Sequence, residues 1–210
     1  MNTSDASQTL NEIKDLMDRS KKFLSLSGGT AILIGIYACI TATAAFFILS
    51  DGQAFHWDNF PKILTHTPYH LRVLGGLAAL LVVASIATAI GMSWLQARKN
   101  GRRLVFDAPA RRLVGSFALP LVTGGLLCLS LFYRGHYGLT SSIMLLFYGL
   151  ALVSAASHTY SSVRYLGYAQ IVLGLIDSCM EGYGIVFWFV GFGLLHIAYG
   201  VWFCILKPKK

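Results

Sequence analysis

The sequence predicts an all-α polytopic membrane protein: a six-helix transmembrane bundle with both termini in the cytoplasm. Three observations lead to this prediction: six long apolar stretches, few charged residues, and an uneven placement of lysine and arginine between successive loops. Hydrophobic residues make up 55% of the chain and charged residues only 12%, whereas about a quarter of an ordinary soluble domain is charged. A soluble core could not bury so much apolar surface, so lipid is the expected solvent for most of the chain.

Each apolar stretch is long enough to cross a bilayer or nearly so, because about twenty apolar residues in a helix match its roughly 30 Å hydrocarbon core. We place the spans at about 29–49, 71–95, 114–133, 140–158, 162–178 and 184–206. Pro68 marks the start of the second helix, since proline is tolerated in a first helical turn. The fifth span is short and carries Arg164, Gln170 and Asp177.

Lysine and arginine orient the spans, because these residues concentrate in short loops on the cytoplasmic side. With the N-terminus inside, fourteen of the 17 basic residues fall on the cytoplasmic side, whereas Lys62, Arg72 and Arg134 fall on the other. Both termini are therefore expected in the cytoplasm. The same distribution accounts for the net charge of +8, so this charge gives no reason to expect a nucleic acid partner.

Two cytoplasmic segments flank the expected transmembrane domain, which covers residues 24–206. Residues 1–23 lack the apolar core and cleavage site of a signal peptide. They begin a helix with a capping box at Thr9 and Glu12, and their apolar residues recur at helical spacing. This pattern predicts an amphipathic helix on the inner membrane surface, either an interfacial anchor, which we favour, or a partner-docking element. Residues 207–210 form a basic tail.

Small residues follow one face of the first span from end to end. They are separated by three or four positions, and they are Gly28, Ala31, Gly35, Ala38, Ala42 and Ala45. Such stripes let two helix backbones approach closely in lipid. We expect a packing surface, either inside the bundle or between copies of the chain. The second span, with Ala84, Ala87 and Gly91, is its natural partner.

Polar groups inside a span are costly, so each one is a candidate functional site. His196 lies about midway along the sixth span and Gln170 at a similar depth in the fifth, so the two side chains could meet across the final hairpin. Tyr148, Tyr168 and Tyr199 could complete a polar patch around them. We favour a hydrogen-bonded pair that fixes helix packing; a ligand or proton site is the alternative.

The sequence predicts no metal or cofactor site. His66 and His70 are four residues apart, but Pro68 removes the helical face that they would need to share. Asp177 and Glu181, near the outer rim, could bind a cation, although we favour solvated caps of a short loop. Glycines inside the apolar helix of the sixth span are assigned to packing, namely Gly184, Gly191, Gly193 and Gly200.

The four cysteines are expected to be free thiols. They are spread singly along the chain, and no CxxC pair occurs. Cys179 could pair with Cys128 as an alternative, because both lie toward the outer side of the bundle.

The loop between the second and third spans carries the densest positive charge. Residues 96–113 hold six basic side chains, Arg98, Lys99, Arg102, Arg103, Arg111 and Arg112. Anionic lipid headgroups on the cytoplasmic side are the expected partner, and a cytosolic regulatory protein is the alternative.

No motif for a reaction or a nucleotide occurs in the chain, so we do not expect an enzyme. The leading hypothesis is a non-enzymatic regulatory or accessory protein that presents basic cytoplasmic surfaces to a partner. The alternative is a small-molecule or ion transporter or channel with a three-plus-three inverted repeat and a midplane site. In support of a repeat, Arg72, Leu74 and Gly75 recur in the other half as Arg164, Leu166 and Gly167.

Two short segments carry a resemblance. The segment LSLSG at 24–28, followed by IGIYA at 34–38, resembles the opening of a group of uncharacterised six-span bacterial membrane proteins. The likeness covers mainly the first span. It implies a bacterial plasma (inner) membrane and, loosely, a winged-helix regulator as a neighbour, and it supplies no catalytic residues.

Overall fold

The computed structural model describes residues 28–50, 68–99, 108–180 and 182–206, and every regular element in these ranges is a helix. The all-α fold class is therefore confirmed. The helices are α2 (Gly28–Leu49), α3 (Pro68–Lys99), α4 (Ala108–Tyr133), α5 (Thr140–Ala155), α6 (Val163–Ser178), and a final helix made of α7 (Gly184–Trp188), η2 (Phe189–Leu194) and α8 (Leu195–Leu206). The amphipathic helix predicted in 1–23 and the tail at 207–210 lie outside the described residues.

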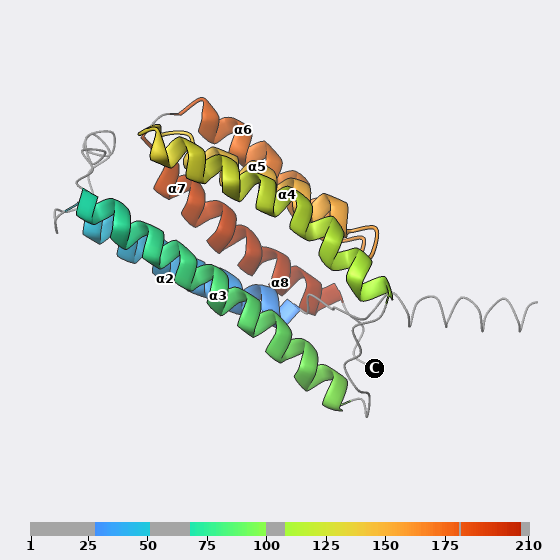
Figure 1. Ribbon diagram of the computed structural model, residues 1–210. Coiled ribbons are helices and arrows are strands. Elements are labelled where there is room, and N and C mark those ends of the chain that lie inside the picture. Colours follow the sequence, from blue (N-terminus) through green and yellow to red (C-terminus); the bar gives the residue numbers. More distant parts are fainter. Residues whose placement is uncertain (1–27, 51–67, 100–107, 181, 207–210) are drawn as a thin grey trace, which may run out of the picture.

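Four of these helical stretches are long and apolar enough to cross a membrane, namely Gly28–Leu49, Arg72–Lys99, Ala110–Tyr133 and Gly184–Ile205. α5 and α6 are shorter, with 16 residues each. Each predicted span coincides with a helix, and α3 begins at Pro68 as its proline indicated. The helices run side by side with their long axes roughly aligned (Figure 1).

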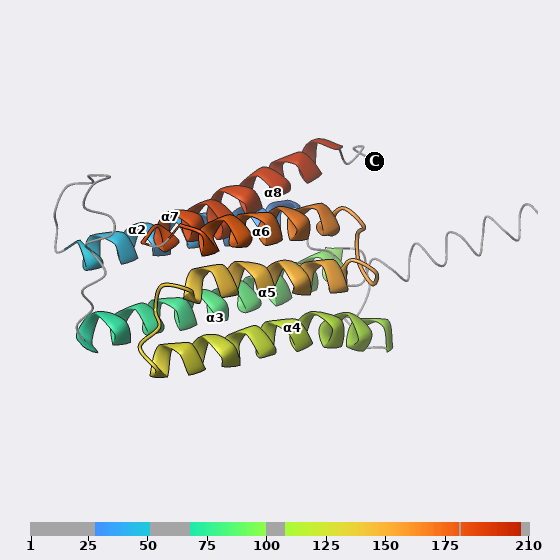
Figure 2. The ribbon, with the colours of Figure 1, turned by 90° about the horizontal axis from the view of Figure 1, so that it is seen from above.

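In the view of Figure 1 the final helix is seen between α2 and α3 on one side and α4, α5 and α6 on the other, and its main contacts are with α2, α5 and α6. Its η2 and α8 parts pack mainly on α2, and its α7 part packs mainly on α5. α5 pairs along its length with α6, while α4 packs on α5 at the edge of the bundle (Figure 2). Only 6% of the membrane-spanning window of α3, and the same share of α4, is buried, so these helices offer their apolar side chains to lipid.

The small-residue stripe of α2 is buried, but its partner is the final helix and not α3. A Cβ atom built on Gly35 would lie 2.8 Å from the Gly193 carbonyl oxygen, and one on Gly200 would lie 2.6 Å from the Gly28 carbonyl oxygen. Gly91 of α3 has open space around it instead. Glycine occurs on both sides of the α2–α8 contact, which allows a closer backbone approach than glycine or alanine on one side alone. The stripe therefore packs within one chain, with Ala45 half-buried at its end.

A second close contact of the same kind joins α5 and α6. A Cβ atom on Gly149 would lie 2.7 Å from the Gly167 carbonyl oxygen, and one on Gly167 would lie 2.8 Å from the Gly149 carbonyl oxygen. Toward the end of α6, a Cβ on Gly174 would lie 3.0 Å from the Ser142 carbonyl oxygen. Two helix pairs with almost no side-chain bulk between them thus hold the bundle together.

We predict that Gly35→Ala destabilises the protein, because the added methyl group must push α2 away from η2 and α8. Overpacking of this kind costs about 1–3 kcal/mol of the free energy of unfolding. Gly125→Ala in α4 is the matched control, since nothing lies within 4 Å of a Cβ at that position. Thermal or denaturant unfolding in detergent measures both variants. Equal free energies of unfolding for the Gly35→Ala and Gly125→Ala variants would contradict the α2–α8 contact.

Candidate functional site

Two buried polar side chains, His196 and Gln170, lie where the final helix changes its winding. η2, over Phe189–Leu194, is a π-helix, and π segments inside α-helices occur frequently at functional sites. His196 follows η2 by two residues and is 1% exposed, while Gln170 of α6 is fully buried. Gln170 faces inward because it shares the buried face of α6, which consists of Val163, Leu166, Gly167, Gln170, Gly174 and Asp177.

One backbone carbonyl connects the two side chains. The Gly191 oxygen accepts a hydrogen bond from Gln170 Nε2 at 2.6 Å and lies 3.1 Å from His196 Nδ1. A carbonyl oxygen can only accept, so Nδ1 carries the imidazole proton in this contact. His196 Nε2 is then the acceptor for the Tyr148 hydroxyl of α5, at 2.7 Å. The structure thus connects His196 and Gln170 through the Gly191 carbonyl and joins Tyr148 to His196.

Aromatic rings surround the imidazole. The Phe192 ring is stacked on His196 at a centroid distance of 6.3 Å, and its centroid lies 5.1 Å from that of Tyr148. Phe117 of α4 meets Tyr148 edge-on at 6.0 Å. An apolar setting of this kind strengthens each hydrogen bond and raises the cost of leaving one unmade.

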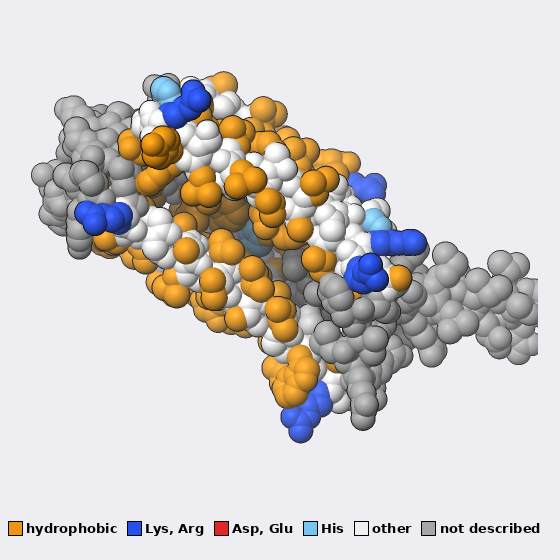
Figure 3. Space-filling view, in the orientation of Figure 1, with side chains coloured by type: hydrophobic (Ala, Val, Ile, Leu, Met, Phe, Trp, Pro, Cys, Tyr) orange, Lys and Arg blue, Asp and Glu red, His pale blue; other side chains and the backbone are white. Residues whose placement is uncertain are grey.

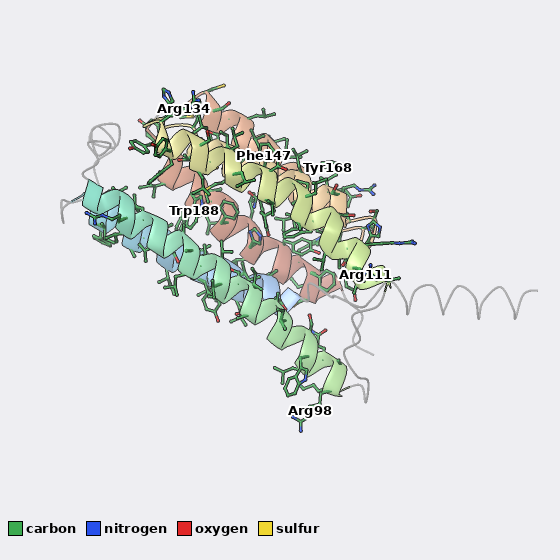
Figure 4. The ribbon with its side chains drawn as sticks, viewed as in Figure 1. Arg98, Arg111, Arg134, Phe147, Tyr168 and Trp188 are labelled. Atoms are coloured by element: carbon green, nitrogen blue, oxygen red, sulfur yellow. The ribbon has the colours of Figure 1, made fainter. Side chains whose placement is uncertain are left out.

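The aromatic row continues from Phe192 to Trp188, whose ring centroid is 5.3 Å away. Trp188 lies on the side of the final helix seen between α3 and α4 (Figure 4). The molecular surface is hollowed between these two helices, and hydrophobic side chains border the hollow (Figure 3). The row of rings therefore leads from this hollow toward the buried imidazole.

Gly191 is a member of the site that sequence reasoning missed. A Cβ atom at this position would lie 2.8 Å from Gln170 Oε1 and would collide with Leu145. Any other residue at position 191 would displace the glutamine that binds its carbonyl. The sequence assigned Gly191 to packing, because no local signal distinguishes it from the neighbouring glycines.

Two of the five predicted residues lie apart from this centre. Tyr168 is 49% exposed, on the outer side of α6. Tyr199 is buried one turn beyond His196, where its hydroxyl lies 3.0 Å from Ser162 Oγ. Tyr199 belongs to a separate polar contact between α8 and the start of α6. The centre consists of Tyr148, Gln170, Gly191 and His196.

Asp177 departs from its predicted role as a solvated cap. Its side chain is only 3% exposed, because it lies on the same buried face of α6 as Gln170. Glu181, its predicted companion, lies outside the described residues.

Several predicted basic residues can be placed. Arg98, Lys99, Arg111 and Arg112 are all exposed, and the Arg98 guanidinium lies over the Trp94 ring, 5.3 Å from its centroid. Arg98 and Arg111 lie at one end of the bundle and Arg134 at the other (Figure 4). Arg102 and Arg103 lie outside the described residues.

Neither disulfide bonds nor clusters of metal-type ligands occur in the described ranges. All four cysteines are free, so Cys128 and Cys179 are not paired. Within these ranges, no three His, Cys, Asp or Glu side chains gather as a metal site would require. The centre holds the imidazole between a hydroxyl donor, Tyr148, and a carbonyl acceptor, Gly191.

The fold and this centre define an all-helical protein with helices of membrane-spanning length. In comparisons with known proteins, no family model, no curated protein and no solved structure matches the chain.

We predict that Tyr148→Phe lowers the free energy of unfolding by about 0.6–1 kcal/mol, the usual value of one hydrogen bond between membrane helices. The loss should disappear in a His196→Leu background, because the acceptor is already absent there. Unfolding of the two single variants and the double variant in detergent gives this coupling energy. Tyr168→Phe is the matched control and should leave stability unchanged. Additive losses would exclude the Tyr148–His196 bond.

Proposed function

We propose that the chain is a six-span protein of a bacterial plasma membrane with both termini in the cytoplasm. Successive helices alternate in direction, so that α2 begins, α3 ends and α8 ends at one end of the bundle (Figure 1). α5 and α6, with 16 residues each, extend for about 24 Å at the helical rise. A helix satisfies its backbone hydrogen bonds internally, so both segments are compatible with lipid.

The described basic side chains support this orientation. Five of them, Arg98, Lys99, Arg111, Arg112 and Arg164, belong to the end of the bundle where α3 ends and α4 and α6 begin, whereas Arg72 and Arg134 belong to the opposite end. We call the first of these the basic end. Short loops on the cytoplasmic side carry the excess of lysine and arginine, so the basic end faces the cytoplasm.

The role that we propose is regulatory or accessory and non-enzymatic, and the basic end is the surface that binds the partner. One observation carries it: the exposed cations Arg98, Lys99, Arg111 and Arg112 flank the connection between α3 and α4. Around the stripe of α2 and around His196, in contrast, the interior is packed and hydrogen-bonded, because α8 covers the stripe and the imidazole has partners on both nitrogens. Anionic headgroups, and an acidic surface of a cytosolic protein, are the partners that such a set of cations attracts.

A small-molecule or ion transporter is the second candidate, and a packing pattern supports it. The third helix of each half packs on the first helix of the other half: α4 on α5, and α8 on α2. A two-fold relation between inverted halves produces this reciprocal exchange. His196 and Gln170 would then form the midplane site, reached from the hollow between α3 and α4.

The orientation predicts which cysteine a membrane-impermeant maleimide reaches in intact cells. Cys179 is exposed at the end of the bundle opposite to the basic end, so we expect it to be labelled from outside. Arg112→Cys, in a background with the four natural cysteines replaced by serine, should react only after permeabilisation. Labelling of that variant in intact cells would reverse the topology.

The regulatory role predicts that the basic end retains a cytosolic partner. Replacement of Arg98, Lys99, Arg111 and Arg112 by glutamine should reduce the amount of partner cross-linked in native membranes by about tenfold or more, because several charge contacts are lost together. Arg134→Gln, at the opposite end, is the control and should leave recovery unchanged. Full recovery with the fourfold variant would refute the proposal.

A His196→Leu protein that folds but loses a transport activity would favour the second candidate.

A further inference from the structure

Asp177 is the only acidic side chain among the described residues, and it is buried. It lies in the last turn of α6, in the part of the bundle opposite to the basic end. Taking a carboxylate out of water is expensive unless an opposite charge or several hydrogen bonds compensate it. Ionisable groups inside a membrane bundle therefore point to a ligand or an ion.

The neighbours of Asp177 are hydroxyls. Its carboxyl lies beside Ser141 and Ser142, in the first turn of α5. Ser142 is 1% exposed, yet its Oγ atom and Asp177 Oδ2 have no hydrogen-bond partner in the described part of the chain. No described basic side chain forms an ion pair with the carboxyl either. Two buried oxygens without a hydrogen bond of good geometry thus lie near each other at the α5–α6 contact, beside the Ser141 hydroxyl.

Three glycines shape the site. Gly174, one turn before Asp177, lets α6 approach the Ser142 backbone. Gly182 has a φ of 93° and turns the chain into α7. The first residue of α7, Gly184, then packs against Ser141, with no room for a Cβ atom. The oxygens are therefore enclosed by three elements.

We propose that Asp177, Ser141 and Ser142 form a binding site for a small monovalent cation of the size of Na⁺. A set made only of oxygens selects a hard cation over a transition metal. The single carboxylate balances one positive charge, whereas a divalent ion would leave an excess charge inside the bundle. The C-terminal end of α6 also favours a cation, because the helix dipole is negative there. This site is separate from the proposed regulatory surface and does not depend on it.

Thermal unfolding of the full-length protein tests the proposal. The protein in detergent is titrated with NaCl against choline chloride at constant ionic strength and constant pH. We expect Na⁺ to raise Tm by about 3 °C for each tenfold increase above its Kd, and choline to have no such effect. Asp177→Asn should abolish the rise, and Ser142→Ala should shift it to higher Na⁺. Ser178→Ala is the matched control, because Ser178 is exposed and its hydroxyl bonds to Leu175 of its own helix.

Three outcomes would overturn the proposal. The first is an equal Tm in Na⁺ and choline, and the second is a Na⁺ response that survives in Asp177→Asn. The third is a wild-type Tm that responds to pH at fixed Na⁺ but not to Na⁺ at fixed pH, which would assign a proton to the carboxyl. If Asp177→Asn does not fold, a Ser141→Ala, Ser142→Ala double variant keeps the carboxylate, and an unchanged Na⁺ response in that variant would equally refute the site.

Discussion

The helices of this bundle associate through close backbone contacts at glycine. Lipid gives apolar helices little reason to associate, so dispersion between surfaces that fit together must supply the attraction. Here that fit occurs twice, where α2 meets α8 and where α5 meets α6. The first pair holds the final helix against α2, and the second holds α6 against α5. Gln170 and His196 sit on these helices and are connected by the Gly191 carbonyl.

Polar groups occur at three depths along the buried interfaces of α6, and each has a different kind of partner. Asp177 faces hydroxyls near one end, Gln170 binds a carbonyl about 10 Å away along the helix axis, and Ser162 bonds to Tyr199 near the other end. Glycine and aliphatic residues separate the three levels. Only the middle level joins three helices through a continuous set of hydrogen bonds.

The sequence predicted much of the fold because long apolar runs and basic loops are local signals. It wrongly named α3 as the partner of the α2 stripe, since small residues occur both there and on the final helix, which packs on the stripe. The positions of His196 and Gln170 along their helices predicted that the two lie at a similar depth. Such positions do not say toward which side of the helix a side chain points. Tyr168 precedes Gln170 by two residues, which turns it to the far side of α6. The burial of Asp177 depends on how closely α5 approaches, which only the packed structure reveals.

The π segment shifts the angular position of every side chain that follows it in the final helix. Its hydrogen bonds skip one residue more than those of an α-helix, so a helical wheel drawn through 184–206 falls out of phase by about 100° beyond η2. α7 can therefore pack on α5 while α8 packs on α2, although both belong to one continuous helix. An alignment that matches this helix to a regular one, in this chain or in a distant relative, should need a one-residue gap near Phe189–Leu194.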